Sequence, residues 1–132
     1  MKRTLITIAV FISALVVSGG SDPAMGAVLD KSCSASGFTG TFRISSSATH
    51  QLSYYYKITK GSNPGGNHAN INLTFSTEPV LTYQSPDSML QDGVFHYLNT
   101  GGLATNPVGV QFIFDLSGAS DPRCTMWVSG VV

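Results

Sequence analysis

Residues 38–58 read FTGTFRISSSATHQLSYYYKI, and two runs within this stretch alternate between apolar and polar side chains. The positions that share one face of these runs are Phe38, Gly40, Phe42 and Ile44, and then Leu52, Tyr54, Tyr56 and Ile58. A period of two residues is typical of strands that are buried on one face and solvated on the other. The stretch therefore predicts two half-buried strands, residues 38–45 and 51–58, joined by a polar connection.

The same type of pattern continues towards the C-terminus. Further strands are predicted at residues 69–76, 80–83, 94–98, 108–116 and 123–132. Segments rich in Gly, Pro, Asn and Asp, which favour turns, separate these runs. About seven strands with regularly spaced turns predict an all-β, antiparallel β-sandwich; an immunoglobulin-like topology is one option, and a small closed barrel is the alternative.

Three details refine this prediction. Ile113 makes the run 108–116 apolar on both faces near its centre, which predicts a strand in the middle of a sheet. Residues 85–91, with Pro86 near their start, are the best helical candidate and would make one short turn. Cys33 precedes the first predicted strand.

The N-terminus has the order of a secretory signal peptide. Lys2 and Arg3 are followed by an apolar run over residues 5–17 and by small, turn-forming residues up to Ala27. The apolar run is shorter than the about 20 residues that span a bilayer, so a membrane anchor is the weaker alternative. We predict a signal peptide over residues 1–26, with cleavage after Gly26 or earlier at Gly20. Residues 27–132 then form a single secreted or periplasmic domain.

The charge of this domain excludes some classes of partner. The whole chain has a formal net charge of +0, and charged residues make up 11% of it. No basic stripe is present, whereas binding to nucleic acid or to an anionic membrane requires clustered Lys and Arg. We therefore expect neither nucleic acid nor membrane insertion after signal cleavage, and the expected partner is an extracellular glycan or protein.

The chain has 2 cysteines, Cys33 and Cys124. In an oxidising compartment, an even pair of cysteines predicts a disulfide. This bond would tie the start of the mature chain to its last strand. Two reduced thiols, or thiols that pair between molecules, are the alternative.

The sequence contains no pattern typical of a catalytic or metal site. His50, His68 and His96 are far apart, with no second ligand at a zinc-binding interval. The motifs of serine hydrolases, zinc proteases, phosphate loops and dinucleotide folds are missing. We therefore predict no catalytic residues, no metal and no cofactor.

Aromatic residues on the predicted strands are the first candidates for a binding surface. In the run Tyr54-Tyr55-Tyr56, only Tyr55 is expected on the outer face, where a ring can stack on a ligand. Trp127 lies on the face opposite Cys124. It would form a patch beside Tyr55 or Tyr97 if that face is exposed, and it would be part of the core if it is not.

Two long loops are the second group of candidates. Residues 59–68 contain Asn63, Asn67 and His68, which could hydrogen-bond a glycan. Residues 84–93 contain Met89 and Leu90, which could insert into a partner's cleft or fold back as a lid over the sandwich. The candidate binding residues are Tyr55, Trp127, Asn63, Asn67, His68, Met89 and Leu90.

These features predict a secreted, non-enzymatic binding module that recognises an extracellular glycan or protein through its loops and an aromatic sheet face. A secreted inhibitor or toxin acting on another protein through the 84–93 loop is the alternative. A small hydrolase built from scattered residues is a third option, which a cleft with His close to Asp or Glu would favour. Asn72-Leu73-Thr74 is an N-glycosylation acceptor in a eukaryotic host.

Overall fold

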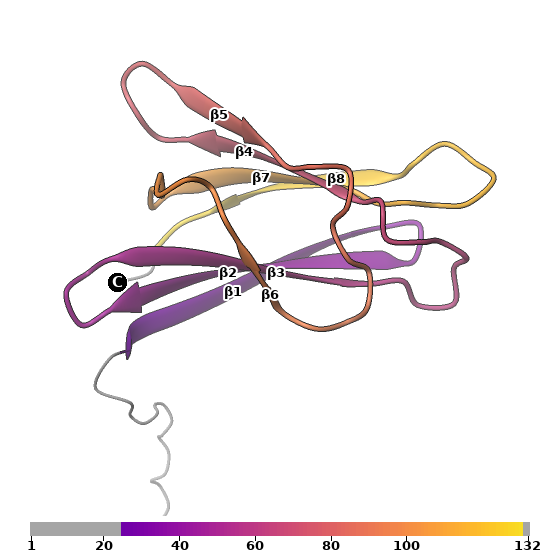
Figure 1. Ribbon diagram of the computed structural model, residues 1–132, viewed down its shortest axis with the longest axis horizontal. Coiled ribbons are helices and arrows are strands. Elements are labelled where there is room, and N and C mark those ends of the chain that lie inside the picture. The colour runs from indigo at the N-terminus through magenta and orange to yellow at the C-terminus, as the bar shows by residue number, and fades with distance from the viewer. Residues whose placement is uncertain (1–24, 131–132) are drawn as a thin grey trace, which may run out of the picture.

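The computed structural model describes residues 25–130 of the chain and contains eight strands (Figure 1). They are β1 (Met25–Ala35), β2 (Phe38–Ser47), β3 (Leu52–Thr59), β4 (Asn70–Phe75), β5 (Leu81–Gln84), β6 (His96–Leu98), β7 (Val108–Ile113) and β8 (Arg123–Val128). Two four-stranded sheets have the orders β1-β2-β3-β6 and β5-β4-β7-β8, and every neighbouring pair is antiparallel. The predicted antiparallel β-sandwich is therefore confirmed.

The core lies between the two sheets and consists of the inward positions of the alternating runs. Its buried members are Phe38, Phe42, Ile44, Tyr54, Tyr56, Ile58, Ala69, Ile71, Leu73, Phe75, Leu98, Val108, Val110, Phe112, Phe114 and Val128. Burying these apolar side chains is the main favourable term in folding. The prediction that the Ile113 run is central is also confirmed, because β7 lies between β4 and β8.

The first strand was not predicted, and Cys33 lies within it rather than before the first strand. The β1 residues opposite inward β2 positions are Ala27, Leu29, Lys31, Cys33 and Ala35. Lys31 interrupts this set, and the remaining side chains are mostly small, so the strand lacks a clear period-two signal. β1 is an edge strand, which is stabilised by pairing along its whole length with β2.

The strand order differs from that of immunoglobulin constant domains. In that fold the second and third strands lie in different sheets, whereas here β2 and β3 pair directly. Residues 85–91 also differ from the predicted helical turn. They contain a turn at Asp87 and Ser88 and a single bridge between Met89 and Ala69, because pairing with Ala69 holds this segment extended.

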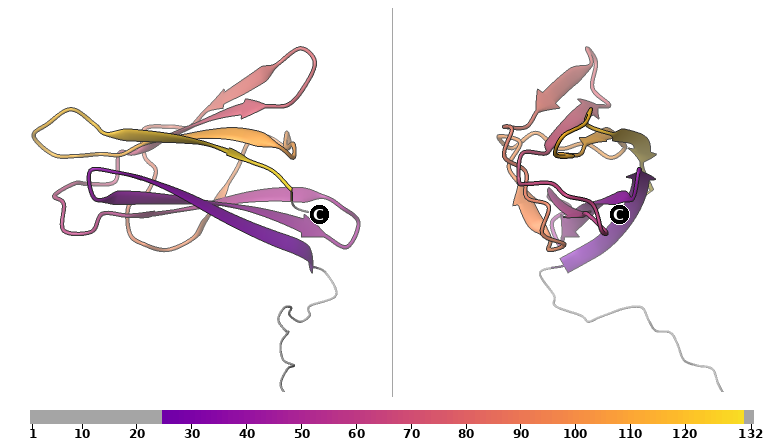
Figure 2. Two further views of the ribbon diagram at one scale, coloured as in Figure 1. Left: turned by 180° about the vertical axis from the view of Figure 1, so that it is seen from behind. Right: turned by 90° about the vertical axis from the view of Figure 1, so that its right-hand side faces the viewer.

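The two sheets are joined along one side by their edge strands. β1 lies beside β8 in Figure 2, and the disulfide between Cys33 and Cys124 links the two strands, with Cα atoms 5.9 Å apart. The Lys31 ammonium also donates a hydrogen bond to the Trp127 carbonyl at 2.8 Å. The predicted disulfide is therefore confirmed. It connects the sheets at the side away from β5 and β6.

Most of the predicted signal peptide lies outside the described residues, so the cleavage after Gly26 stays a prediction. The described part of that segment is Met25 and Gly26, at the beginning of β1. Within residues 25–130, the structure has no helix that is long and apolar enough to cross a membrane.

Candidate functional site

The outer face of the β1-β2-β3-β6 sheet carries a row of charged and aromatic side chains. Asp30, Arg43, Tyr55 and Tyr97 lie in register across its four strands. Arg43 donates two hydrogen bonds to the Asp30 carboxylate, at 2.7 and 2.9 Å. These hydrogen bonds raise the pKa of Arg43 above its ordinary value. The pair therefore carries no net charge at neutral pH.

Aromatic rings complete this surface. The rings of Tyr55 and Tyr97 meet edge to face, with centroids 5.6 Å apart. Just before β6, the Phe95 ring lies 3.9 Å from the Arg43 Cζ atom and 4.8 Å from the Lys57 Nζ atom. Such contacts between a cation and an aromatic ring hold both groups in place. We call the surface formed by Asp30, Arg43, Tyr55, Lys57, Phe95 and Tyr97 the charged face.

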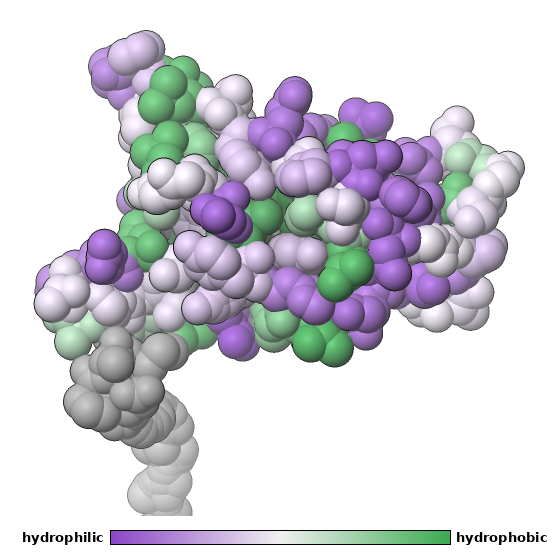
Figure 3. All heavy atoms as spheres, in the orientation of Figure 1, coloured by the Kyte–Doolittle hydropathy of each residue, from purple (hydrophilic) through white to green (hydrophobic). Residues whose placement is uncertain are grey.

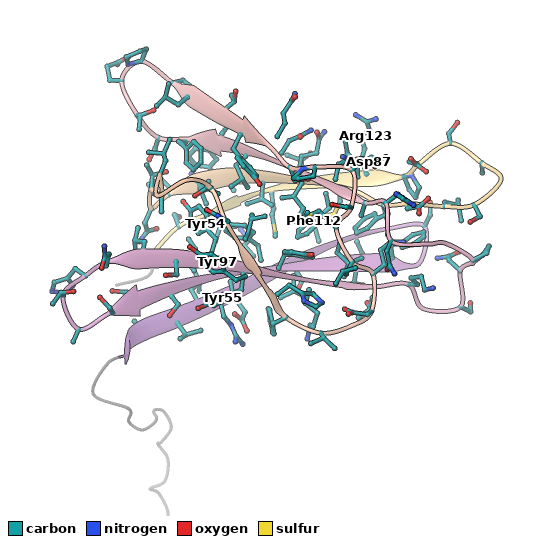
Figure 4. The ribbon with its side chains drawn as sticks, viewed as in Figure 1. Tyr54, Tyr55, Asp87, Tyr97, Phe112 and Arg123 are labelled. Carbon is teal, nitrogen blue, oxygen red and sulfur yellow. A yellow bond between two sulfur atoms is a disulfide. The ribbon has the colours of Figure 1, made fainter. Side chains whose placement is uncertain are left out.

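Neighbouring tyrosines on β3 occupy opposite sides of the sheet. Tyr54 and Tyr56 are buried in the core, whereas Tyr55 faces outward, as predicted (Figure 4). The Tyr54 hydroxyl donates to the Thr105 carbonyl at 2.6 Å and accepts from the Thr105 N–H at 2.7 Å. Burial raises the pKa of Tyr54. The sheet pattern therefore leaves Tyr55 as the member of this run available to a ligand.

Two adjacent rows on the outer face of the β5-β4-β7-β8 sheet are built from neutral side chains. One row in register across the four strands contains Thr82, Thr74, Gly109 and Trp127, and the next contains Gln84, Asn72, Gln111 and Thr125. We call these two rows the indole face. Beyond them, Arg123 adds a positive charge at one end of the face.

Trp127 is exposed on the indole face, with 49% of its surface accessible. A Cβ atom at Gly109 would lie 3.0 and 3.1 Å from two atoms of the indole ring, so the ring occupies the space left by the missing side chain. In the adjacent row, Asn72 donates to the Gln111 side-chain oxygen at 3.0 Å. The face therefore combines an exposed apolar ring with side-chain amides and hydroxyls.

Trp127 and Tyr55 do not form one patch. Each points away from the core, but Tyr55 belongs to β3 and Trp127 to β8, so they lie on opposite outer faces. The neighbour of Tyr55 is Tyr97, which Figure 4 shows beside it on the same layer. Of the two predicted options for Trp127, exposure is therefore right, but a patch beside Tyr55 or Tyr97 is wrong.

The polar loop residues serve mainly to hold the loops together at one end of the sandwich. The Asn63 amide donates to the Ser36 carbonyl at 2.8 Å. The Asn67 side-chain oxygen accepts from the Gln91 N–H at 2.9 Å, and His68 Nδ1 lies 3.0 Å from the Asp87 carbonyl oxygen. These hydrogen bonds occupy groups that were predicted to bind a glycan.

Gln91 connects the same loops from the inside. It is 3% exposed, and its side-chain nitrogen donates to the Gly66 and Asp115 carbonyls. Its side-chain oxygen accepts from the Asp115 N–H at 2.9 Å. Gly65 packs so closely against the Asp115 carbonyl oxygen that an added Cβ would clash with it. Sequence reasoning missed Gln91, because a lone polar residue in a loop has no periodic signal.

The loop over residues 84–93 folds back on the domain. Met89 exchanges two backbone hydrogen bonds with Ala69 and packs against the core, and the Leu90 N–H donates to the Tyr56 hydroxyl at 3.1 Å. Both side chains are half-buried. This geometry agrees with a lid rather than with a protruding contact loop.

A pocket of about 470 Å³ lies between the two loops, lined by Thr59, Lys60, Gly61, Asn67, Gln91, Asp92 and Gly93. At its edge, His96 Nε2 lies 2.9 Å from both oxygens of Asp92. Burial alone would raise the pKa of Asp92, but hydrogen bonds from His96 and from the Val94 N–H lower it. In the described part of the chain, neither residue is hydrogen-bonded to a serine, threonine or tyrosine hydroxyl. The structure therefore brings a His and an Asp together without a nucleophile.

The described residues 25–130 contain no group of three or more His, Cys, Asp or Glu side chains that could hold a metal ion. The exposed apolar side chains include Val80 and Leu81, and hydrophobic atoms are visible along the arm formed by the β4–β5 hairpin (Figure 3).

In comparisons with known proteins, no family model, curated protein or solved structure matches this chain.

Proposed function

We propose that this protein is a secreted, non-enzymatic binding module that recognises a neutral carbohydrate through the indole face. The observation that supports this proposal best is the position of Trp127. Its ring is half exposed beside Gly109 and Thr74, in a face whose two rows carry no charge.

The chemistry of the indole face is complementary to a sugar. Sugar rings present C–H groups on their faces and hydroxyls around their edges. An aromatic ring provides a large rigid apolar surface for the former. Side-chain amides both donate and accept, as hydroxyls do. The Asn72 and Gln111 pair keeps an oxygen on Asn72 and a nitrogen on Gln111 free of other hydrogen bonds within residues 25–130.

The size of the face favours an oligosaccharide over a single sugar. Neighbouring strands lie about 4.8 Å apart, so a row across four strands spans about 14 Å. Trp127 stands at one end of such a row, on the edge strand β8, and Thr82 stands at the other end on β5. A glycan stacked on Trp127 can therefore continue over Thr74 towards Thr82.

Export of the protein is part of the proposal. The disulfide between Cys33 and Cys124 is typical of proteins outside the reducing cytoplasm. The basic, apolar and small-residue order of the first 26 residues is typical of a signal peptide. A location in the periplasm or outside the cell would also give the domain access to extracellular glycans.

The alternatives receive less support from the geometry. An inhibitor acting through residues 84–93 would need exposed apolar anchors, but Met89 is packed against the core. A hydrolase would need a nucleophile or a second carboxylate beside His96 and Asp92. The described contacts of Asp92 are to His96 and to the Val94 N–H.

A glycan array tests the proposal. We expect the protein, with its disulfide intact, to bind at least one neutral oligosaccharide, and Trp127→Ala to lower that affinity at least tenfold, about 1.4 kcal/mol. Tyr55→Ala is the matched control, because it removes an outward aromatic ring from the other face. Thermal melting of both variants checks that they fold. Binding to no neutral glycan, or equal losses in both variants, would contradict the proposal.

A further inference from the structure

The charged face contains one cation that the protein does not neutralise. Arg43 is paired with Asp30 through two hydrogen bonds. Lys57 lies one position further along β3 on the same face, opposite Thr41, and makes no salt bridge within residues 25–130. Its ammonium is held 4.8 Å from the Phe95 ring centroid. This contact fixes the position of the charge without cancelling it.

An exposed aromatic ring lies next to this charge. Tyr97 is 61% exposed, and its ring is held edge to face against Tyr55. Tyr55 and Lys57 are two residues apart on β3, so their side chains leave the same face of the sheet about 6.7 Å apart. A ligand that covers the Tyr55 and Tyr97 rings therefore brings its next substituent within reach of Lys57.

From this arrangement we infer that the charged face is a second binding site, selective for sugars that carry a carboxylate. The sugar ring packs against Tyr97, and its carboxylate pairs with the Lys57 ammonium. Arg43 acts as a positioning residue, because its guanidinium stacks 3.9 Å from the centroid of the Phe95 ring that holds Lys57. The site lies on the opposite sheet from Trp127 and does not depend on the function proposed for the indole face.

Charge and shape together favour a saccharide over an acidic polypeptide. An acidic polypeptide carries its carboxylates on flexible side chains. On this face they would meet one ammonium that is not already paired, and no second cation. A uronic or sialic acid, in contrast, carries its carboxylate directly on a rigid ring, which places the charge and the stacking surface at a fixed separation. Preorganisation of both partners lowers the entropic cost of binding.

The test compares carboxylate-bearing oligosaccharides, uronates and sialosides, with the same oligosaccharides after methyl esterification. Esterification removes the charge and keeps the ring. At low ionic strength we expect at least one acid to bind tenfold or more tightly than its ester. We expect this preference to shrink in 0.5 M salt, because salt screens exposed charges. Titration calorimetry with the disulfide-bonded protein measures both forms.

Two variants locate the site, and two more serve as controls. Lys57→Gln should remove the preference for the acid, and Tyr97→Ala should weaken binding of both acid and ester. Arg123→Gln is the matched control, because it removes a cation from the other sheet, and it should leave the preference unchanged. Trp127→Ala should also leave it unchanged, which separates this site from the indole face.

Three results would overturn the inference. The first is that no acid binds in preference to its ester, and the second is that Lys57→Gln keeps the preference. The third is that poly-L-glutamate binds as tightly as the acidic oligosaccharides, which would assign the face to an acidic polypeptide. None of these results affects the proposal for the indole face, because the binding of neutral glycans there is tested separately with Trp127→Ala.

Discussion

The two outer faces of the sandwich use aromatic side chains in different ways. On the charged face, rings contact each other and contact cations, as in the pairing of Tyr55 with Tyr97 and of Phe95 with Arg43. On the indole face, Trp127 lies against a glycine and has neutral neighbours. The difference shows that exposure of an aromatic ring does not by itself define a ligand. The chemistry of the side chains around the ring determines which ligand it fits.

The largest effect is expected when the covalent link between the two sheets is removed. The double variant Cys33→Ser, Cys124→Ser opens a loop with a sequence separation of 91 residues. We expect the free energy of unfolding to fall by about 2–5 kcal/mol. Because each face is built within one sheet, the molecules that stay folded should keep their ligand preferences. Urea unfolding gives the stability, and calorimetry in the absence of urea gives the binding.

The comparison between the faces would fail if this variant folded but lost binding on both of them. In that case the faces would depend on how the sheets are held relative to each other at β1 and β8. Loss on one face alone would assign that dependence to a single sheet.

Sequence patterns predicted most strands because those strands bury one face. The runs containing Phe42, Tyr54, Ile71 and Phe112 all show the period of two. β1 was missed because Lys31 stands at one of its inward positions and donates to a carbonyl on β8 instead of entering the core. Local hydrophobicity could not predict a strand whose stability comes from pairing and from a disulfide.

The candidate sites were less predictable than the strands, because they depend on register and on sheet membership. The sequence predicts that Tyr55 faces outward but leaves Trp127 either exposed or in the core, and only the strand order places the two residues on opposite outer faces. The contacts of Arg43 with Phe95, and of Trp127 with Gly109, join segments that are distant in sequence. Local sequence patterns do not indicate which outward-facing side chains on different segments contact each other.

The next largest effect is expected from substitutions of two neighbouring tyrosines on β3. One of them lies in the core and the other on the charged face, so the two variants compare these regions. Tyr54→Phe leaves the N–H and carbonyl of Thr105 without their buried partner, so we expect a loss of about 1–3 kcal/mol in stability. Tyr55→Phe removes a hydroxyl from the outer face and should change stability by less than about 0.5 kcal/mol. Denaturant unfolding of both variants measures the difference. Equal losses would mean that the charged face is also part of the structural core.

A substitution at Gly109 should affect the indole face selectively. Valine suits a strand, but its Cβ would meet the Trp127 ring at 3.0 to 3.1 Å, so the ring must move. We expect Gly109→Val to weaken binding of a neutral glycan about tenfold, or about 1.4 kcal/mol, and to leave binding on the charged face unchanged. Ile113→Val, on the same strand and away from the indole, is the control. Unchanged glycan binding in Gly109→Val would show that the position of the ring is not important.

The smallest effect is expected at Asp92, next to the charged face. The folded chain lowers the pKa of Asp92 below its ordinary value of 3.8, so the ionised carboxylate stabilises the fold above that pH. This contribution is lost as the pH falls through the lowered pKa. Exposed ion pairs contribute at most about 1 kcal/mol, so Asp92→Asn should be slightly less stable than wild type at pH 6.

Because the stabilising contribution of Asp92 is lost as the pH falls through its lowered pKa, the stability curves of Asp92→Asn and wild type should converge at acidic pH, below the ordinary value of 3.8. Thermal melting between pH 2 and pH 7 measures this convergence. The ring of His96, the partner of Asp92, packs at a tilt against the buried ring of Tyr56, whereas Tyr97 beside it faces outward. The variant should therefore keep its preference for acidic sugars. A loss of that preference would show that the loop end and the charged face form one site.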